Sequence, residues 1–318
     1  MRPLKNRGSV RSSLALIATA GIVAVALSGC AAQAPAPGAE PGNSSSTIDV
    51  TGDFGKTPKV EFPTPLTPEE TECTEVIEGE GPLIQNGQPV AIDFAMYNGA
   101  TGDLLQSNGF GDQAPVPVVA SDSVVFPGLA KGLTCAREGS RVAIVMPQKD
   151  GFGESPQALQ LGVNPGDSLV FVVDVHQAFP ARADGAPQLT RDGFPAVVLA
   201  PDGRPGVTVP KAAPPKQSEV ELLKSGSGEV VEDGDQVIVQ FTSVDWKTNE
   251  VSASTWEDGS ATGVVAGDGG QGGPLPPAVT KALVGKKAGS QIGVIVVPEG
   301  DDASGSAQFY VVDVLGAL

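Results

Sequence analysis

The stretch that decides the fold is VFPGLAKGL, residues 125–133, in which a proline follows two apolar residues and opens a short helix-forming run. Proline is favoured in the first turn of a helix, because its missing N–H would have no partner there in any case. The stretch therefore predicts one short helix over Pro127–Thr134.

Segments rich in β-branched and aromatic residues lie on both sides of this helix and predict β-strands. In the first half of the chain they are Val90–Tyr97, Arg141–Met146 and Ser168–Val175, and turn sequences such as Asn98-Gly99 bound them. The pattern predicts an antiparallel sheet with one short helix, which is an α+β fold.

The second half of the chain repeats this pattern. GQPVAIDF (87–94) corresponds to GDQVIVQF (234–241), and FVVDV (171–175) corresponds to YVVDV (310–314). A long period with drifting spacing indicates duplicated globular domains, not a solenoid. The repeated elements are a helix and three strands, over Pro277–Val284, Gln236–Val244, Gln291–Val297 and Gln308–Leu315.

The N-terminus predicts export and lipid anchoring. Residues 1–11 are basic, and the apolar run 14–27 is too short for an ordinary transmembrane helix but suits the apolar core of a signal peptide. Leu27-Ser28-Gly29-Cys30 resembles the lipobox of bacterial lipoproteins, which implies that Cys30 is lipid-modified and becomes the first mature residue. Several acyl chains hold a protein stably on a membrane. The alternative is an ordinary secretory signal with a chance cysteine.

These patterns divide the chain into five segments. They are a signal peptide over 1–29, a flexible Pro/Ala/Ser/Gly-rich tether over 30–46, a first domain over 47–178, a linker over 179–191 and a second domain over 192–318. We therefore expect a protein held on the extracytoplasmic face of the cell membrane.

Composition narrows the partners and the chemistry. A formal net charge of −17 repels nucleic acid, which excludes it as a direct partner. Cys73 and Cys135 remain as an even pair in an oxidising compartment, so we expect a disulfide, with two buried thiols as the alternative. The single His176 belongs to no cluster of metal-ligand residues, and we expect neither a metal nor a cofactor.

The order of motifs resembles that of FKBP-type peptidyl-prolyl isomerases. An apolar strand and a Gly turn come first, followed by VFPGLAKGL, then GSR (139–141), an aromatic-Gly loop and SLVFVVDV (168–175). The resemblance covers nearly all of 70–178 and again 217–315. It implies two domains, each a bent antiparallel sheet wrapped around one short helix, with an apolar pocket that takes a substrate proline.

The resemblance also implies which residues form the pocket. Leu129 stands where the family has a tryptophan floor, Gln106 where it has an aspartate, and Phe152 where it has a tyrosine whose hydroxyl bonds a substrate carbonyl. The full implied set is Phe94, Leu105, Gln106, Val125, Phe126, Leu129, Phe152, Val163 and Phe171.

The chemistry that this pocket implies needs no nucleophile. Rotation about a peptide bond crosses a barrier of roughly 18–20 kcal/mol, and an apolar pocket with a backbone donor such as Phe126 N–H lowers it by favouring the twisted amide. We expect a prolyl isomerase or folding helper for proline-containing extracytoplasmic polypeptides. Its activity should be weak and confined to the first domain, because Ser252, Ala253 and Val279 replace pocket residues in the second. The alternative is a non-catalytic binding or scaffold module.

Overall fold

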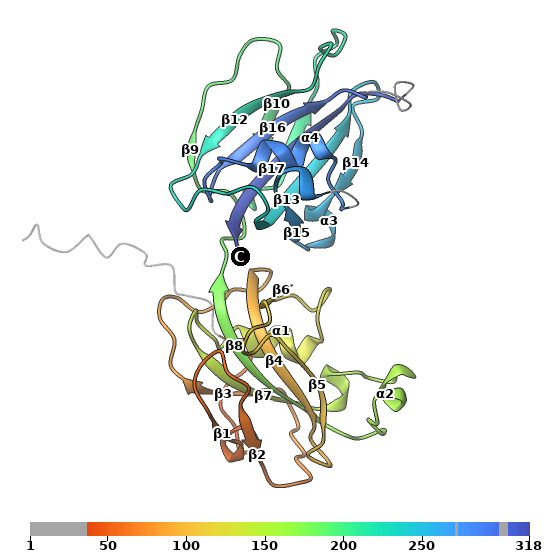
Figure 1. Ribbon diagram of the computed structural model, residues 1–318. Helices are drawn as coiled ribbons and strands as arrows, with labels where there is room; N and C mark the ends of the chain where they lie inside the picture. The colour runs from red at the N-terminus through yellow and green to blue at the C-terminus, as the bar shows by residue number, and fades with distance from the viewer. Residues whose placement is uncertain (1–36, 271–272, 299–304) are drawn as a thin grey trace, which may run out of the picture. The chain divides into compact units, whose positions relative to one another are not determined.

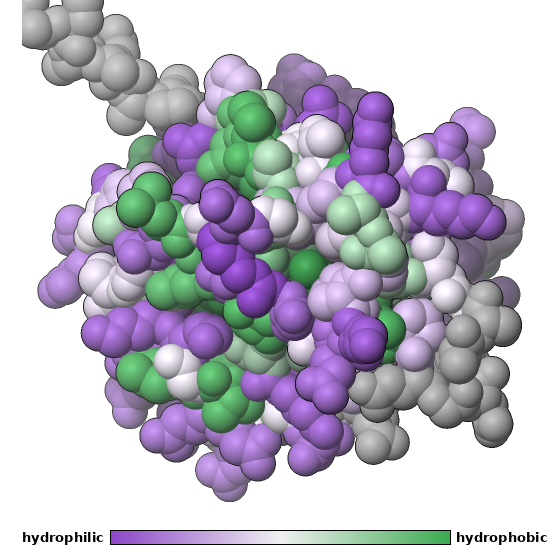
Figure 2. Space-filling view, turned by 90° about the horizontal axis from the view of Figure 1, so that it is seen from above, coloured by the Kyte–Doolittle hydropathy of each residue, from purple (hydrophilic) through white to green (hydrophobic). Residues whose placement is uncertain are grey.

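The computed structural model describes residues 37–270, 273–298 and 305–318 (Figure 1). The predicted signal peptide, Cys30 and the first part of the tether lie outside the described residues. In the part that is described, no helix is long and apolar enough to span a membrane. Hydrophilic residues cover much of the face seen in Figure 2, and hydrophobic residues form separate patches among them.

The first domain is built on a six-stranded antiparallel sheet with the strand order β3-β7-β8-β4-β5, to which β6 adds by pairing with β4. Each strand predicted from the sequence is present; Arg141–Met146 has the predicted bounds, and the ends of the other two strands move by one to three residues. The strands are β3 (Glu72–Ile77), β4 (Pro89–Asn98), β5 (Leu104–Asn108), β6 (Val116–Val119), β7 (Arg141–Met146) and β8 (Leu169–Ala178).

Helix α1 (Pro127–Leu133) packs closely on β7, and two glycines make this approach possible (Figure 1). A Cβ atom on Gly128 would lie 2.6 Å from the Cβ of Met146, and one on Gly132 would lie 2.5 Å from the Cδ1 of Ile144. Both separations are too short for real carbon atoms. Leu129 is 6% exposed and anchors the helix in the main core of the domain.

A β-hairpin covers the opposite face of the same sheet. Along β8, Phe171 and Val173 belong to the core around α1, whereas Val170 and Val172 belong to a second apolar cluster. Successive residues of a strand point to opposite faces, so the two clusters lie on opposite sides. The hairpin of β1 (Asp49–Thr51) and β2 (Lys59–Glu61) packs on this second cluster.

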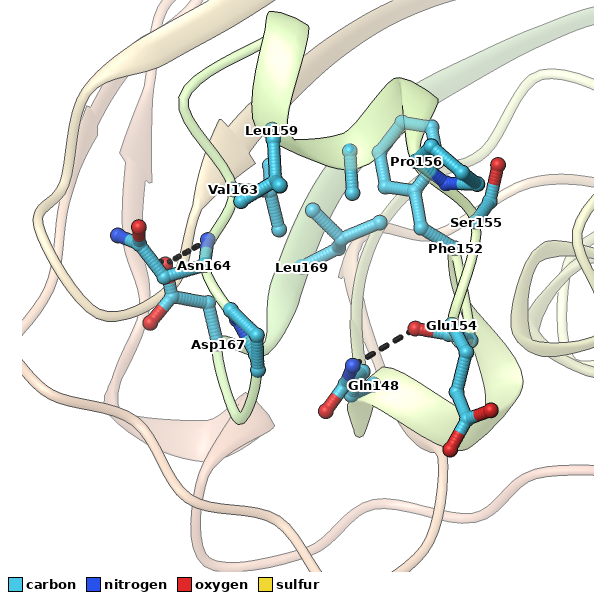
Figure 3. Close-up of a pocket in the computed structure, with 13 residues that line it drawn as sticks. Gln148, Phe152, Glu154, Ser155, Pro156, Leu159, Val163, Asn164, Asp167 and Leu169 are labelled. Carbon is cyan, nitrogen blue, oxygen red and sulfur yellow. Dashed lines mark hydrogen bonds between the residues drawn. The ribbon is translucent and has the colours of Figure 1, made fainter.

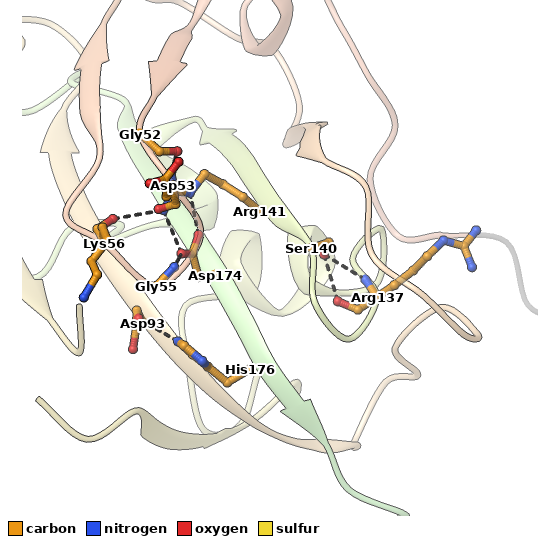
Figure 4. Close-up of polar contacts among 10 residues, drawn as sticks. All are labelled: Gly52, Asp53, Gly55, Lys56, Asp93, Arg137, Ser140, Arg141, Asp174 and His176. Atoms are coloured by element: carbon orange, nitrogen blue, oxygen red, sulfur yellow. Dashed lines mark hydrogen bonds and ion pairs between the residues drawn. The ribbon is translucent and has the colours of Figure 1, made fainter. Parts of the chain in front are cut away.

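A buried ion pair ties this hairpin to the sheet (Figure 4). Arg141 Nε and Nη2 donate to the two carboxylate oxygens of Asp174 at 2.5 and 2.7 Å, and both side chains are 0% exposed. Arg141 Nη1 and Nη2 also donate to carbonyl oxygens in the turn over residues 52–56, and Gly55 N–H donates to Asp174. Because removing either partner would leave a buried charge alone, the pair and the turn form one structural unit.

Two predicted boundaries are corrected. Within the predicted tether, Ser44 and Ser45 donate backbone N–H groups to Glu72 at 2.7 and 2.8 Å, so residues 37–46 pack on the first domain. Within the predicted linker, Phe179 N–H donates to Pro89 O and Ala183 N–H to Asp313, which leaves only 180–182 as a connection. Composition alone missed both contacts, because small and polar residues pack here through their backbone groups.

A disulfide links Cys73 on β3 with Cys135, which follows α1. The two Cα atoms are 6.6 Å apart and the residues are separated by 62 positions in the sequence. It is the pair expected from the even cysteine count, and it fastens the end of α1 to an edge region of the sheet. Closing a loop of this length stabilises a fold by roughly 4 kcal/mol in the chain-entropy model.

The second domain repeats the design on a seven-stranded sheet, with the order β14-β13-β17-β16-β12-β9 and β15 paired to β13. Its hairpin of β10 and β11 packs on one face, as β1 and β2 do in the first domain. The bounds are β9 (Ala186–Pro187), β10 (Ala196–Leu199), β11 (Pro205–Thr208), β12 (Glu219–Ser225), β13 (Gln236–Asp245), β14 (Val251–Ser254), β15 (Thr262–Val265), α4 (Pro277–Leu283), β16 (Gln291–Val296) and β17 (Gln308–Ala317).

The predicted α+β class with two sheet-and-helix domains is confirmed. Each domain also contains a one-turn helix that the sequence did not predict, α2 (Gln157–Gln160) in the first and α3 (Thr255–Asp258) in the second. Such a short helix covers too few residues to show a helical period in the sequence.

The second domain has a buried carboxyl group without the arginine of the first. Gln291 occupies the position of Arg141 and donates to Asp313 Oδ1 at 2.6 Å, while Ala183 N–H donates to Oδ2. Burial raises the pKa of Asp313, although these hydrogen bonds and the charges of Lys224 and Arg182 oppose the shift. The ionised form is therefore disfavoured in the folded state.

We predict that Asp313→Asn makes the second domain less sensitive to pH. A carboxyl group whose pKa is raised by folding contributes stability that is complete below its unfolded pKa of about 3.9 and is lost as the pH rises through the folded value. Urea unfolding, followed by the fluorescence of Trp246 and Trp256, both in this domain, measures the effect.

The parent should lose stability relative to Asp313→Asn as the pH rises from about 4 to 7. The exposed Asp202→Asn serves as the control and should follow the parent at every pH. Parallel pH curves for parent and Asp313→Asn would contradict the prediction.

Candidate functional site

An apolar cavity of about 470 Å³ lies in the first domain, between β4, the start of α1 and the loop that follows β7. Most of the residues implied by the sequence line it. They are Phe94, Gln106, Val125, Phe126, Leu129, Phe152 and Phe171.

Strand alternation explains how β4 and β8 contribute to this cavity. Ile92, Phe94 and Met96 are two positions apart on β4 and all line it. Phe171 on β8 lies opposite Met96 in the register. Phe94 was predicted from the sequence and Ile92 and Met96 were not, although their period of two along the strand was a sufficient signal.

Four phenylalanine rings form a continuous series around the cavity. The ring centroids of Phe94 and Phe171 are 6.1 Å apart, those of Phe171 and Phe126 are 6.1 Å apart, and those of Phe126 and Phe152 are 4.8 Å apart. The last two pairs meet edge to face, a favoured aromatic geometry. None of the four side chains carries a hydroxyl, so the series presents an apolar wall.

A backbone donor lies at the edge of this wall. Phe126 is the N-cap residue of α1, with φ −51° and ψ 138°. Its carbonyl accepts the N–H of Ala130, and no group in the described part of the chain accepts its own N–H. Phe126 therefore supplies both a ring and an available N–H.

Two implied pocket residues lie elsewhere, and the structure corrects their assignment. Leu105 is the extra residue of a β-bulge, between the pairs Met96–Gln106 and Tyr97–Leu104, and it packs on the core without lining the cavity. A bulge re-aims side chains, which a count along the sequence does not reveal. Val163 is 2% exposed and lines a different cavity.

That second cavity, of about 490 Å³, shares Phe152 with the first cavity as a lining residue (Figure 3). It is lined mainly by the loop of residues 148–167, which includes α2. Gln148 braces this loop, because its Nε2 donates to Gly153 O and its Oε1 accepts from Gly166 N–H, both at 2.7 Å. Phe152 is thus a partition between two cavities.

Asp150 fixes the loop that carries Phe152 to the helix that carries Leu129. Lys131 Nζ on α1 lies 3.0 Å from both carboxylate oxygens of Asp150, and Thr71 Oγ1 donates to Oδ2 at 2.7 Å. Burial would raise the pKa of Asp150, but the bonds from Thr71 and Lys131 outweigh it and lower the pKa. These contacts of Asp150 were not predicted from the sequence, because the residues that make them are far apart along the chain.

The equivalent region of the second domain keeps the scaffold and loses the site. Phe241 and Tyr310 retain the ring pair, with centroids 6.4 Å apart. The N-cap of α4, however, is Pro276, which has neither an N–H nor an aromatic ring. Val279 stands at the floor and is fully buried. The last loop, Pro298–Gly305, lies mostly outside the described residues.

We predict that Asp150→Asn loosens the wall of the cavity. The neutral amide loses its charge-assisted bond to Lys131, which should lower the stability of the first domain by about 1–2 kcal/mol, a reduced figure because Lys131 is partly solvent-exposed. Hydrogen exchange, read by mass spectrometry, should become faster in residues 148–153.

A carboxyl group whose pKa is lowered by folding contributes stability that is lost as the pH falls through the lowered value. The parent should therefore lose the same protection from hydrogen exchange as the pH falls through the lowered pKa of Asp150. The matched control is Lys149→Gln, which removes the exposed pair with Glu70 on the same loop and a charge near Asp150 but leaves the hydrogen bonds of Asp150 to Lys131 and Thr71 in place. Equal exchange rates in both variants would show that Asp150 does not hold residues 148–153 to α1.

Comparison with known proteins identifies a relative for part of the chain. A curated FK506-binding protein from Streptomyces anulatus is 25% identical over 118 residues, which are 37% of this chain and 94% of that protein. No family model matches the sequence.

The solved structures that match this chain include FKBP proteins from plants and bacteria. The three FKBP domains of wheat FKBP73 match 78% of this chain and 95% of that chain, with 17% identity and a TM-score of 0.34. FkpA from Escherichia coli matches 35% of this chain and 49% of that chain, with 21% identity and a TM-score of 0.28. The curated sequence match and the sheet-and-helix domains together support the FKBP-type peptidyl-prolyl isomerase family for this chain.

Proposed function

We propose that the first domain isomerises X–Pro bonds of extracytoplasmic polypeptides. The single observation that carries the proposal is the Phe126 N–H without an acceptor, placed at the edge of a cavity with four aromatic rings. An apolar cavity and a free donor are the two features that this reaction requires.

The reaction changes the charge distribution of the prolyl amide. The planar amide is charge-separated by resonance, and this separation is lost as the C–N bond rotates. An apolar wall therefore solvates the twisted amide better, relative to the planar one, than water does. In this proposal the Phe126 N–H donates to the rotated carbonyl oxygen, which would strengthen binding in the transition state.

The second domain serves as a non-catalytic module in this proposal. Pro276 supplies no N–H at the position of Phe126, and Val279 is shorter than Leu129. The scaffold that remains is suited to holding the chain or a partner, not to rotating an amide.

The proposal includes a location. Cys30 would carry the lipid, and the domains would face the extracytoplasmic side, where unfolded exported chains contain X–Pro bonds in both isomers. The support is the Leu27-Ser28-Gly29-Cys30 sequence after a basic and apolar leader.

A non-catalytic binding role for the first domain is the second candidate. Leu129 at the floor and Phe152 without a hydroxyl give a cavity that binds a prolyl ring while making fewer directed contacts to its amide. Such a site would hold proline-containing segments without changing their isomer.

We predict weak isomerase activity for the isolated segment 37–179 and none above background for 183–318, in a refolding assay limited by prolyl isomerisation. Phe126→Ala should reduce the activity by roughly tenfold or more, because it opens the cavity to water. Phe152→Tyr should increase it, because it restores a hydroxyl donor. Activity in the second segment alone would refute the assignment, and peptide binding without activity in the first would support the second candidate.

For the anchor, we predict that substitution of Cys30 by Ser leaves an uncleaved or released protein without acyl chains. The parent should stay bound after a carbonate wash, and its N-terminal peptide should carry acyl chains by mass spectrometry. A parent without acyl chains that stays on the membrane as firmly as the variant would argue against lipid attachment at this residue.

A further inference from the structure

The cavity beyond Phe152 has an apolar interior that the proposed reaction does not use. Its lining includes Leu169, which is 1% exposed, and Val163, which is 2% exposed, together with Phe152 itself. In Figure 3 the side chains of Val163, Leu169 and Phe152 lie around the same space. Its volume, about 490 Å³, is similar to that of the first cavity and is ample for one large side chain.

Two of the polar residues that line this cavity, Gln148 and Asp167, are already engaged by hydrogen bonds, and the lining residue Glu154 is exposed to solvent. The side-chain amide of Gln148 forms a hydrogen bond at each end: Nε2 donates to Gly153 O, and Oε1 accepts from Gly166 N–H. Asp167 Oδ2 accepts from Asn164 N–H at 2.8 Å and from Asn98 Nδ2 at 3.0 Å. Because these groups are already bonded, the cavity favours an apolar ligand over a polar one.

Exposed leucines mark the rims of both cavities. Leu159 is 62% exposed and lines the second cavity, and Leu161 is 40% exposed and lines the first. Both belong to α2 or directly follow it. Large exposed apolar residues gathered around cavities are typical of surfaces that bind other polypeptides. The partition, Phe152, is common to both cavities, so one bound segment can reach both.

We propose that the second cavity binds an apolar side chain of the same client segment, two positions before the proline held in the first cavity. The inference rests on the proposed function and gives it a substrate class, an apolar residue followed by any residue and then proline. The residue before a proline is restricted to extended conformations. In an extended chain, side chains two positions apart point the same way and lie roughly 6.5–7 Å apart, far enough to pass on either side of one ring.

The test compares synthetic peptides in which the position two before proline is Leu, Ala or Glu. Binding to the full mature chain is measured by fluorescence anisotropy, and catalysis by NMR exchange spectroscopy on the same peptides. We expect the Leu peptide to bind roughly fivefold more tightly than the Ala peptide, which is a partial gain because the cavity is open on one side. The Glu peptide should bind no better than the Ala peptide, because its carboxylate would be desolvated.

Leu159→Ser should reduce the preference for Leu to about twofold or less, and should leave binding of the Ala peptide unchanged. Because Leu159 is exposed, the substitution leaves the core intact. The matched control is Leu104→Ser, at a residue of the same domain that is 56% exposed and lines neither cavity, and it should keep the full preference.

The outcomes separate this inference from the proposed function. Catalysis of all peptides with no preference at this position, or a preference that Leu159→Ser leaves intact, overturns the second site and spares the isomerase. A preference that depends on Leu159, without catalysis, supports the second site and refutes the isomerase. Failure of every peptide both to bind and to react overturns both.

Discussion

The close contact between α1 and β7 is the constraint on which the cavity depends. Gly128 and Gly132 let the helix approach Met146 and Ile144, and the helix then presents Leu129 as the floor and Phe126 at the edge. In the second domain the helix residues are larger and the strand residues are smaller. Ala278 and Ala282 replace the two glycines, and Val296 and Val294 replace Met146 and Ile144. Such volume-conserving exchanges preserve packing, and they explain how two diverged copies keep one fold.

Other differences between the copies change the hydrogen-bonding and ionic groups at equivalent positions. Phe126 becomes Pro276, which removes both a ring and an N–H from the start of the helix. Arg141 becomes Gln291, which leaves the buried Asp313 without a directly bonded cation. The first domain thus keeps its apolar cavity, its donor and the Asp150 tie, whereas the second keeps the sheet, the helix and the covering hairpin. This pattern is the one expected if, as proposed above, only the first copy acts on prolyl bonds.

Much of this architecture follows from the sequence, because strands and short helices depend on local patterns. The long strands such as Pro89–Asn98 and the helix after Phe126 were predicted within a few residues. Features that depend on contacts distant in sequence were not. Leu105 is turned aside by a bulge, residues 37–46 pack through backbone groups on Glu72, and Asp150 finds its partners on α1 and before β3. The cavity beyond Phe152 is enclosed by a loop whose conformation Gln148 braces, and no local pattern predicts such a brace.

The central claim is that a prolyl residue occupies the cavity above Leu129 in the first domain and no equivalent place in the second. Methyl NMR of the mature chain, with labelled leucine and valine, tests it during titration with an X–Pro peptide. We predict that the methyl signals of Leu129 and Val125 shift and saturate together while those of Val279 do not move. Shifts at Val279, or a saturating titration that leaves Leu129 and Val125 unmoved, would contradict the account.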